Sequence, residues 1–123
     1  MARYVDGIVI PVPKKNLKTY LAMAKVSAKV WIKHGALEYV EAMGDDISKG
    51  KVTSFPKSVK LKAGEVVMFA YVVYKSRAHR DRVMAKVMSD EVITKMWDTM
   101  PFDGMRMIWG GFNTVVTASA RGK

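Results

Sequence analysis

Three polar side chains stand inside or beside apolar segments, and each could donate or accept a proton. Glu41 shares one face of a strand-like segment with Tyr39, Asp6 interrupts a second apolar segment, and His34 ends a long helical one. A carboxylate on an apolar face must be paired or change its pKa, and histidine is the side chain that titrates nearest neutral pH. Asp6, His34 and Glu41 are therefore our candidate catalytic residues, as general acids or bases.

Arg106 is a candidate anchor for a ligand. Its guanidinium lies in an otherwise apolar segment and has the geometry that binds a carboxylate or a phosphate. With Asp6 and Glu41 it could belong either to a structural ion-pair network or to a polar cluster in a binding cavity. His34 also has a structural alternative, because a histidine at a helix end can interact with backbone carbonyls.

Aromatic side chains and one turn-rich segment could form the walls of such a cavity. Tyr39, Trp109 and Phe112 would supply apolar walls, while Thr53 and Phe55 would stand at its rim. Apolar walls with a few polar groups are usual for small-molecule sites. The predicted ligand-binding residues are Tyr39, Arg106, Trp109, Phe112, Thr53 and Phe55.

Several chemistries are excluded by what the sequence lacks. It has no cysteine, which removes disulfides, thiolate zinc sites, iron–sulfur clusters and cysteine nucleophiles. No His-x-His, His-Glu-x-x-His, P-loop, Gly-x-Gly-x-x-Gly or Gly-x-Ser-x-Gly motif is present. Asp45 and Asp46 could hold a cation, but after Gly44 they are more typical of a solvated turn. We therefore expect neither a metal nor a cofactor.

The chain is strongly basic, with a formal net charge of +10 from 21 Lys+Arg against 11 Asp+Glu. Between Gly7 and Leu37 it carries lysines and no acidic residue. A basic stripe of this kind could bind a polyanion, although a solvated helix face also explains it. The lysines are Lys14, Lys15, Lys18, Lys25, Lys29 and Lys33.

One segment partly matches a strand signature of RNA-recognition motifs. Residues 69–74 run aromatic, Ala, aromatic, Val, Val, aromatic, as in the second part of that signature. Val67-Met68 replaces the expected basic residue and glycine, and the first predicted strand has no central aromatic for base stacking. RNA binding through the basic surface and the Phe69–Tyr74 strand is therefore an alternative function.

The segments that must position these residues are apolar on both faces. Residues 66–74 contain no charged side chain, residues 107–112 contain none either, and residues 6–12 are apolar apart from Asp6. A strand with one solvated face would alternate apolar and polar residues. Both faces are therefore expected to be covered, one by helices and the other by a second copy of the chain.

The order of predicted elements indicates an α+β fold over a single domain, residues 1–123. A β-α-β-β-α-(α)-β order is the split βαβ arrangement of ferredoxin-like folds. No signal peptide and no membrane-length apolar run is present, so a cytoplasmic protein without membrane contact is expected. The predicted elements are strands at 4–12, 36–43, 65–74 and 105–118, a helix at 14–34, helices that begin after Ser76 and Ser89, and a long loop at 44–64 with an extended piece at 52–55.

Short motifs spread along nearly the whole chain resemble the uncharacterised YbaA-like family, domain of unknown function 1428. The resemblance implies a ferredoxin-like subunit that pairs into a dimeric α/β barrel, and it implies no activity because the function of the family is not established. The wider superfamily includes cofactor-free monooxygenases and haem-binding proteins, and analogy with them concerns the fold alone. The motifs include Tyr4-Val5-Asp6-Gly7, His34-Gly35-Ala36-Leu37, Gly44-Asp45-Asp46, Gly50-Lys51-Val52-Thr53-Ser54-Phe55-Pro56 and Pro101-Phe102-Asp103-Gly104-Met105-Arg106.

The hypothesis that joins these observations is a homodimer that binds a small, partly apolar molecule in the barrel cavity. Cofactor-free chemistry on an aromatic compound would be an extension of it. The alternatives are the nucleic-acid-binding module and a structural dimer without a ligand.

Overall fold

A computed structural model describes residues 2–120, and the ends of the predicted domain, residue 1 and residues 121–123, lie outside the described residues. One antiparallel sheet has helices on one side, so the predicted α+β, ferredoxin-like fold is confirmed. The elements are β1 (Tyr4–Pro13), a 3-10 turn η1 (Lys14–Asn16), α1 (Leu17–Lys33), β2 (Glu38–Met43), α2 (Phe55–Ser58), β3 (Glu65–Tyr74), α3 (Arg77–Met88), α4 (Glu91–Met96) and β4 (Ile108–Asn113).

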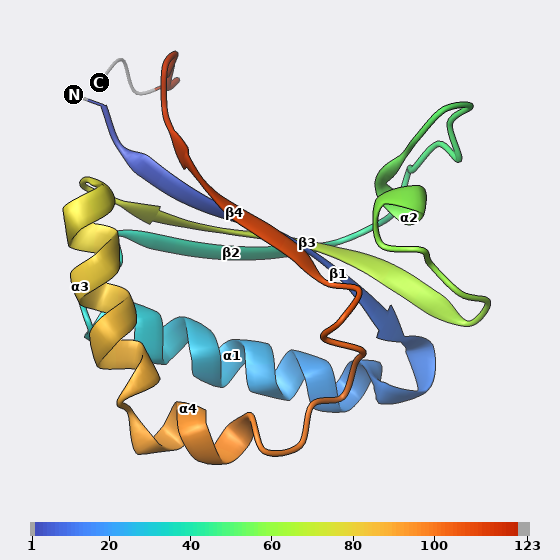
Figure 1. The fold of residues 1–123 in the computed structure, drawn as a ribbon, viewed down its shortest axis with the longest axis horizontal. Helices are drawn as coiled ribbons and strands as arrows, with labels where there is room; N and C mark the ends of the chain where they lie inside the picture. Colours follow the sequence, from blue (N-terminus) through green and yellow to red (C-terminus); the bar gives the residue numbers. More distant parts are fainter. Residues whose placement is uncertain (1, 121–123) are drawn as a thin grey trace.

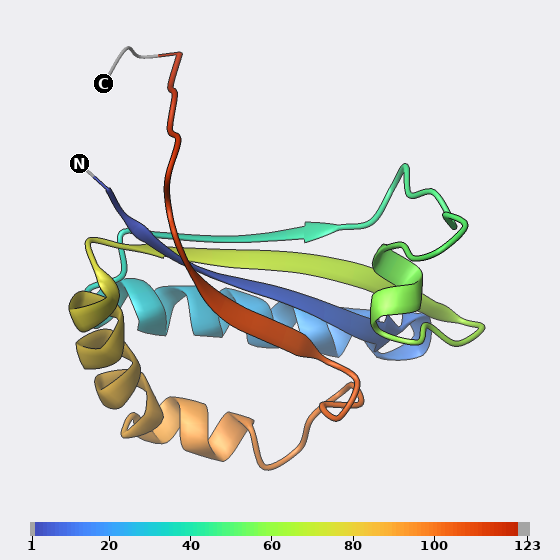
Figure 2. The ribbon, with the colours of Figure 1, turned by 45° about the horizontal axis from the view of Figure 1, so that its top comes forward.

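The sheet has the strand order β2-β3-β1-β4, with every neighbouring pair antiparallel. The central strands β1 and β3 pair along their full length, from Tyr4 opposite Tyr74 to Pro13 opposite Glu65. Successive side chains point to opposite faces, so this register decides which residues meet the helices. Figures 1 and 2 show α1, α3 and α4 on one side of the sheet only.

The core lies between the sheet and these helices. α1 buries Tyr20, Ser27, Val30 and Trp31, and the Trp31 indole donates a hydrogen bond to the Tyr74 hydroxyl (3.2 Å). This bond satisfies the polar ends of two large side chains that are both buried. The cluster that they form extends to α3 and α4.

Two helix starts differ in detail from the expectation. Ser76 caps α3 as predicted, because its hydroxyl accepts a hydrogen bond from the His79 backbone (3.1 Å). Asp90, rather than the predicted Ser89, caps α4, and its carboxylate accepts from the Val92 backbone (2.9 Å). The Ser89 hydroxyl instead donates to the Ala85 carbonyl at the end of α3 (3.0 Å).

The loop at 44–64 and the last strand also differ from the expectation. The predicted extended piece at 52–55 is wrong at Phe55, where α2 begins, although Ser54, which caps this helix, has an extended backbone. The last strand is shorter than the predicted 105–118. Residues 104–105 form a turn, and the pairing ends at Asn113 because β1, its neighbour in the described sheet, begins at Tyr4 opposite that residue. Beyond that pair, Thr114 still bonds to the Arg3 backbone.

The second face of the sheet has no helical layer among residues 2–120. Only loop 44–64 with α2 lies over one end of it (Figure 2). Ile108, Phe112 and Phe69 point to this side and are exposed, while Tyr71 is half-buried. We call this side the open face.

No helix in the described part of the chain is long and apolar enough to cross a membrane.

The packing of α4 can be tested at Ile93, which is fully buried in the main core, whereas the neighbouring Val92 is half exposed. Ile93→Ala should lower the free energy of unfolding by about 2–5 kcal/mol, because it leaves a cavity. Val92→Ala should change it by less than about 0.5 kcal/mol. Urea titrations at one fixed protein concentration measure both values, and equal effects would show that α4 does not belong to the core.

A candidate ligand pocket under the 44–64 loop

A pocket with a volume of about 470 Å³ lies between the loop that follows β2 and the ends of β2 and β3. Its walls are mainly apolar, and Met43, Ile47, Phe55, Val67 and Phe69 contribute most of them. Asp46 and Thr53 are among its polar lining residues. This volume falls in the range of small-molecule sites.

The loop is held on the open face by a small core of its own. Val59 is fully buried and forms a cluster with Val9 of β1 and Val67 of β3. Ile47 and Leu61, from both ends of the loop, pack against this cluster. The loop therefore buries part of the apolar open face within the single chain. The same packing holds the pocket wall that Ile47 and Val67 form.

Hydrogen bonds fold the tip of the loop back on itself. The Lys57 ammonium donates to the carbonyls of Gly50 (3.1 Å) and Lys51 (2.6 Å). Gly50 has a positive φ of 63°, and a Cβ there would lie 2.0 Å from the Thr53 carbonyl oxygen. Only glycine fits this turn without displacing Thr53, a lining residue.

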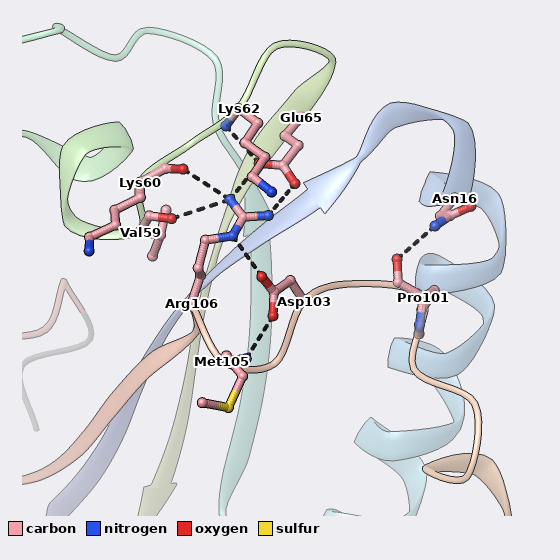
Figure 3. Close-up of polar contacts among 9 residues, drawn as sticks. All are labelled: Asn16, Val59, Lys60, Lys62, Glu65, Pro101, Asp103, Met105 and Arg106. Atoms are coloured by element: carbon pink, nitrogen blue, oxygen red, sulfur yellow. Dashed lines mark hydrogen bonds and ion pairs between the residues drawn. The ribbon is translucent and has the colours of Figure 1, made fainter.

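Arg106 joins the base of the loop to the segment before β4 (Figure 3). Its guanidinium donates to both carboxylate oxygens of Glu65 (2.8 and 2.6 Å) and through Nε to Asp103 (2.9 Å). It also donates to the backbone carbonyls of Lys60 (3.0 Å) and Val59 (3.4 Å). Each guanidinium nitrogen thus has a protein acceptor, so the expected role of Arg106 as the anchor of an anionic ligand is replaced by a structural one.

The neighbouring contacts in Figure 3 tie the same region to the helices. The Asn16 side chain donates to the Pro101 carbonyl (3.0 Å), and the Met105 backbone donates to the Asp103 carboxylate (3.0 Å). The Arg106 hydrogen bonds hold the pKa values of Glu65 and Asp103 below their ordinary values. These carboxylates and Arg106 are therefore mutually stabilised in their charged forms.

The candidate catalytic residues lie on the helix side of the sheet and do not line the pocket. Asp6 is buried and lies 3.4 Å from Arg80, between Oδ1 and Nη1. Burial raises the pKa of Asp6, and the positive charge of Arg80 opposes this shift. Asp6 thus belongs to the packing of β1 against α3.

Glu41 and His34 are also used inside the fold. The Glu41 carboxylate accepts hydrogen bonds from the hydroxyls of Tyr20 and Tyr39 (2.8 Å for Tyr39), and burial raises the pKa of both phenols. His34 Nε2 lies 2.8 Å from the carboxylate of Asp90, where it joins the end of α1 to the start of α4.

The hypothesis of one polar cluster that joins Asp6, Glu41 and Arg106 is therefore wrong. Each of the three has its own partners in a different part of the fold. The alternation of side chains along a strand shows which face of the sheet Asp6 and Glu41 point to, but it does not identify their partners. The sequence therefore could not show that Asp6, Glu41 and Arg106 belong to three separate groups. Among residues 2–120 no group of three or more His, Asp and Glu side chains is placed to hold a metal ion.

The predicted ligand-binding residues are divided between the two sides of the sheet. Thr53 and Phe55 line the pocket, and Phe112 lies on the open face, with its ring beside Gly7 and Gly110. Trp109 and Tyr39 pair opposite Ile8 and Val72, on the helix side. Tyr39 packs against Trp31 there, at a ring-centroid distance of 5.7 Å.

Sequence reasoning missed Phe69 and Ile47 as pocket residues. Phe69 has the same parity as Glu65 in β3, and its ring lies 6.1 Å from Phe55 and 6.2 Å from Tyr71. The alternation along β3 could have identified Phe69, because it places Phe69 on the face opposite to that of Tyr74, which is buried under the helices. Ile47 gave no comparable signal, because nothing in a turn-rich segment marks which side chain folds back onto the sheet.

Comparisons with known proteins place this geometry in a wider context. A family model described as "Protein of unknown function (DUF1428)" matches residues 3–104, which include all of the pocket residues. The "Uncharacterized protein YbaA" of Escherichia coli strain K12 is 40% identical over 114 residues, which cover 93% of this chain and 97% of that protein. The protein of the same name in Shigella flexneri matches to the same extent.

A solved structure is similar in fold. It is the crystal structure of a dimeric ferredoxin-like protein from an uncultured marine organism. It aligns with a TM-score of 0.57 and 11% identity, over 98% of this chain and all of that one. This likeness supports the fold and nothing finer.

The Arg106 contacts predict a pH-dependent contribution to stability. Because the folded pKa values of Glu65 and Asp103 are lowered, this contribution is complete above their ordinary values of 4.5 and 3.8 and is lost as the pH falls through the lowered values. Arg106→Gln should lower the melting temperature by several degrees at pH 7, and the difference from the wild type should shrink below about pH 4.

Circular dichroism melts between pH 7 and pH 3 measure this effect. Arg82→Gln, at an exposed position of α3, removes the same charge and should leave the melting temperature nearly unchanged. A difference for Arg106→Gln that stays constant down to pH 3 would contradict a role for the two carboxylates.

Proposed function

This chain belongs to the family described as "Protein of unknown function (DUF1428)", and we propose that it is a homodimer that binds a small, partly apolar molecule. The two copies pair through the open faces of their sheets. The ligand occupies the pocket between loop 44–64 and strands β2 and β3.

The observation that carries the proposal is the difference between the two faces of the sheet. The helix side holds the main core and leaves Trp109 exposed at its edge, whereas the open side leaves Phe69, Ile108 and Phe112 in water. Apolar surface in contact with water costs about 25 cal/mol for each Å², so a contiguous patch of this kind marks an interaction surface. In this proposal a second copy covers it with an equally apolar surface, and the description of the ferredoxin-like neighbour as dimeric supports the pairing of two copies.

The pocket borders the same face. Phe69 is both a pocket wall and a member of the open face, and Ala42 of β2 has the same parity. In the single chain the pocket is open toward solvent, and a paired sheet restricts that opening. Dimerisation and ligand binding are therefore coupled through Phe69 in this proposal.

The pocket chemistry favours binding over proton transfer. Among residues 2–120, Asp46 is the only lining side chain that carries a charge at neutral pH, and no histidine, lysine or arginine of this part of the chain lines the pocket. Asp6, His34 and Glu41 have structural partners elsewhere in the fold. For any of these three residues to act in catalysis, a substrate would have to bind on the side of the sheet that the helices cover.

Nucleic-acid binding is the second candidate, favoured by the placement of Phe69 and Tyr71 side by side on the open face of a basic protein. Opposite them on β1 stand Val9 and Gly7, which offer no second stacking platform. The two proposals exclude each other on this face, because a partner sheet and stacked bases would occupy the same surface.

The dimer can be tested on β4, where Phe112 and Trp109 are exposed to similar extents, 62% and 65%, on opposite faces of the sheet. Light scattering after size exclusion should give twice the chain mass of 13.8 kDa for the wild type. Phe112→Glu buries a charge in the interface and should raise the dimer Kd by about 100-fold or more. Trp109→Glu is expected to stay dimeric.

A monomeric wild type at micromolar concentration would overturn the dimer. If that monomer also binds single-stranded RNA at near-physiological salt, and Tyr71→Ala abolishes this binding, the second candidate replaces the first.

The pocket can be tested with a small neutral aromatic compound, 2-phenylethanol, followed by nuclear magnetic resonance shifts of the pocket residues. Phe55→Ala removes an aromatic wall and should weaken binding about five- to tenfold. Val52→Ala is the matched control in the same loop, because Val52 is almost fully exposed and does not line the pocket. Shifts spread over the whole surface instead of the pocket would contradict the site.

A further inference from the structure

We infer that the pocket selects cationic ligands, namely molecules that combine an aromatic or aliphatic body with a protonated amine. This inference rests on the proposed function of the pocket and adds the class of ligand. It follows from the charge of the lining, the commitments of its hydroxyl groups and the arrangement of its aromatic walls.

The first observation is the sign of the charge. Asp46 carries the one charge of the lining, although the whole chain has a formal net charge of +10. No ion pair found among residues 2–120 involves Asp46. At physiological salt the field of lysines farther away than about 8 Å is largely screened, so mainly the charges close to the pocket act on a ligand in it.

The second observation is that the basic groups nearest in the chain do not line the pocket. Lys57 turns its ammonium onto the carbonyls of Gly50 and Lys51, and Lys49 and Lys51 are absent from the lining. Arg106 is bound by Glu65, Asp103 and backbone carbonyls. An anionic ligand would therefore find no partner charge in the lining and would be repelled by Asp46.

The third observation is how the hydroxyl groups of the lining are used. Ser48 accepts from the Gly50 backbone (3.0 Å), and Ser54 accepts from the Lys57 backbone (3.1 Å). Both thereby build the loop itself. Among residues 2–120 the side chains of Asp46 and Thr53 make no hydrogen bond that builds the loop, and their oxygen atoms are acceptors suited to an ammonium group.

The aromatic walls have a geometry that also favours a cation. Phe55 and Phe69 stand edge to face, with an interplanar angle of 73° and a centroid distance of 6.1 Å. An ammonium group near a ring face is attracted by the negative potential of that face. A pocket lined by one carboxylate and two aromatic rings thus offers both contacts that an aromatic or alkyl amine needs.

The test compares three compounds of similar size and different charge: 2-phenylethylamine, 2-phenylethanol and phenylacetate. Their affinities are measured at pH 7 and near-physiological salt by magnetic resonance titration, with wild type, Asp46→Asn and Asp45→Asn. Asp45 is the matched control, because it precedes Asp46, is exposed and does not line the pocket. The two variants change the net charge equally, so they separate a local contact from the overall field.

For the wild type we expect the amine to bind about three- to fivefold more tightly than the alcohol, and phenylacetate more weakly than both. Asp46→Asn should abolish the advantage of the amine over the alcohol, with both affinities measured on the same variant. Asp45→Asn should preserve that advantage.

The outcomes separate this inference from the proposed function. If the alcohol binds in the pocket and the amine gains nothing, or if phenylacetate binds most tightly, the charge preference is overturned while the pocket stands. If Asp45→Asn removes the advantage as fully as Asp46→Asn, the preference comes from the overall field and the inference fails. If none of the three compounds binds, the proposed pocket fails as well.

Discussion

The antiparallel pairing of β1 with β3 is the interaction on which the rest of the structure depends. Both strands are apolar on both faces, so this ladder must be covered twice. On one side the helices bury Tyr4, Val72 and Tyr74, and on the other the loop residues Val59 and Ile47 cover one end. The part of the second side that the loop does not cover is the exposed area of the open face.

The strict alternation of strands also separates two kinds of chemistry in one short element. In β2, Glu41 points to the helices and meets two tyrosine hydroxyls, while its neighbour Ala42 lines the pocket. The titratable groups inside the fold therefore stabilise the contact between helices and sheet. Among the described residues, the pocket is left with apolar walls and one carboxylate.

Much of the fold could be predicted from the sequence because its strands and its long helix have strong local patterns. The prediction for β3 matches Glu65–Tyr74, and the expectation that the helices cover one face of the sheet is confirmed. The polar pairs could not be predicted, because their partners are far apart in the sequence. Arg106 and Glu65, for example, are separated by 41 positions. Ser89 and Asp90 are both good helix caps, and the contact of Asp90 with His34 shows that tertiary context decides between them.

The contacts of Arg106 also have a consequence for the order in which the chain acquires its structure. The loop that roofs the pocket lies in the middle of the sequence, yet its base is fastened by Arg106 and Asp103 near the C-terminal end. A chain that grows from its N-terminus on the ribosome can form α1 and the β2–β3 hairpin before those residues have been synthesised. The pocket is therefore among the last parts of this domain to be completed during synthesis.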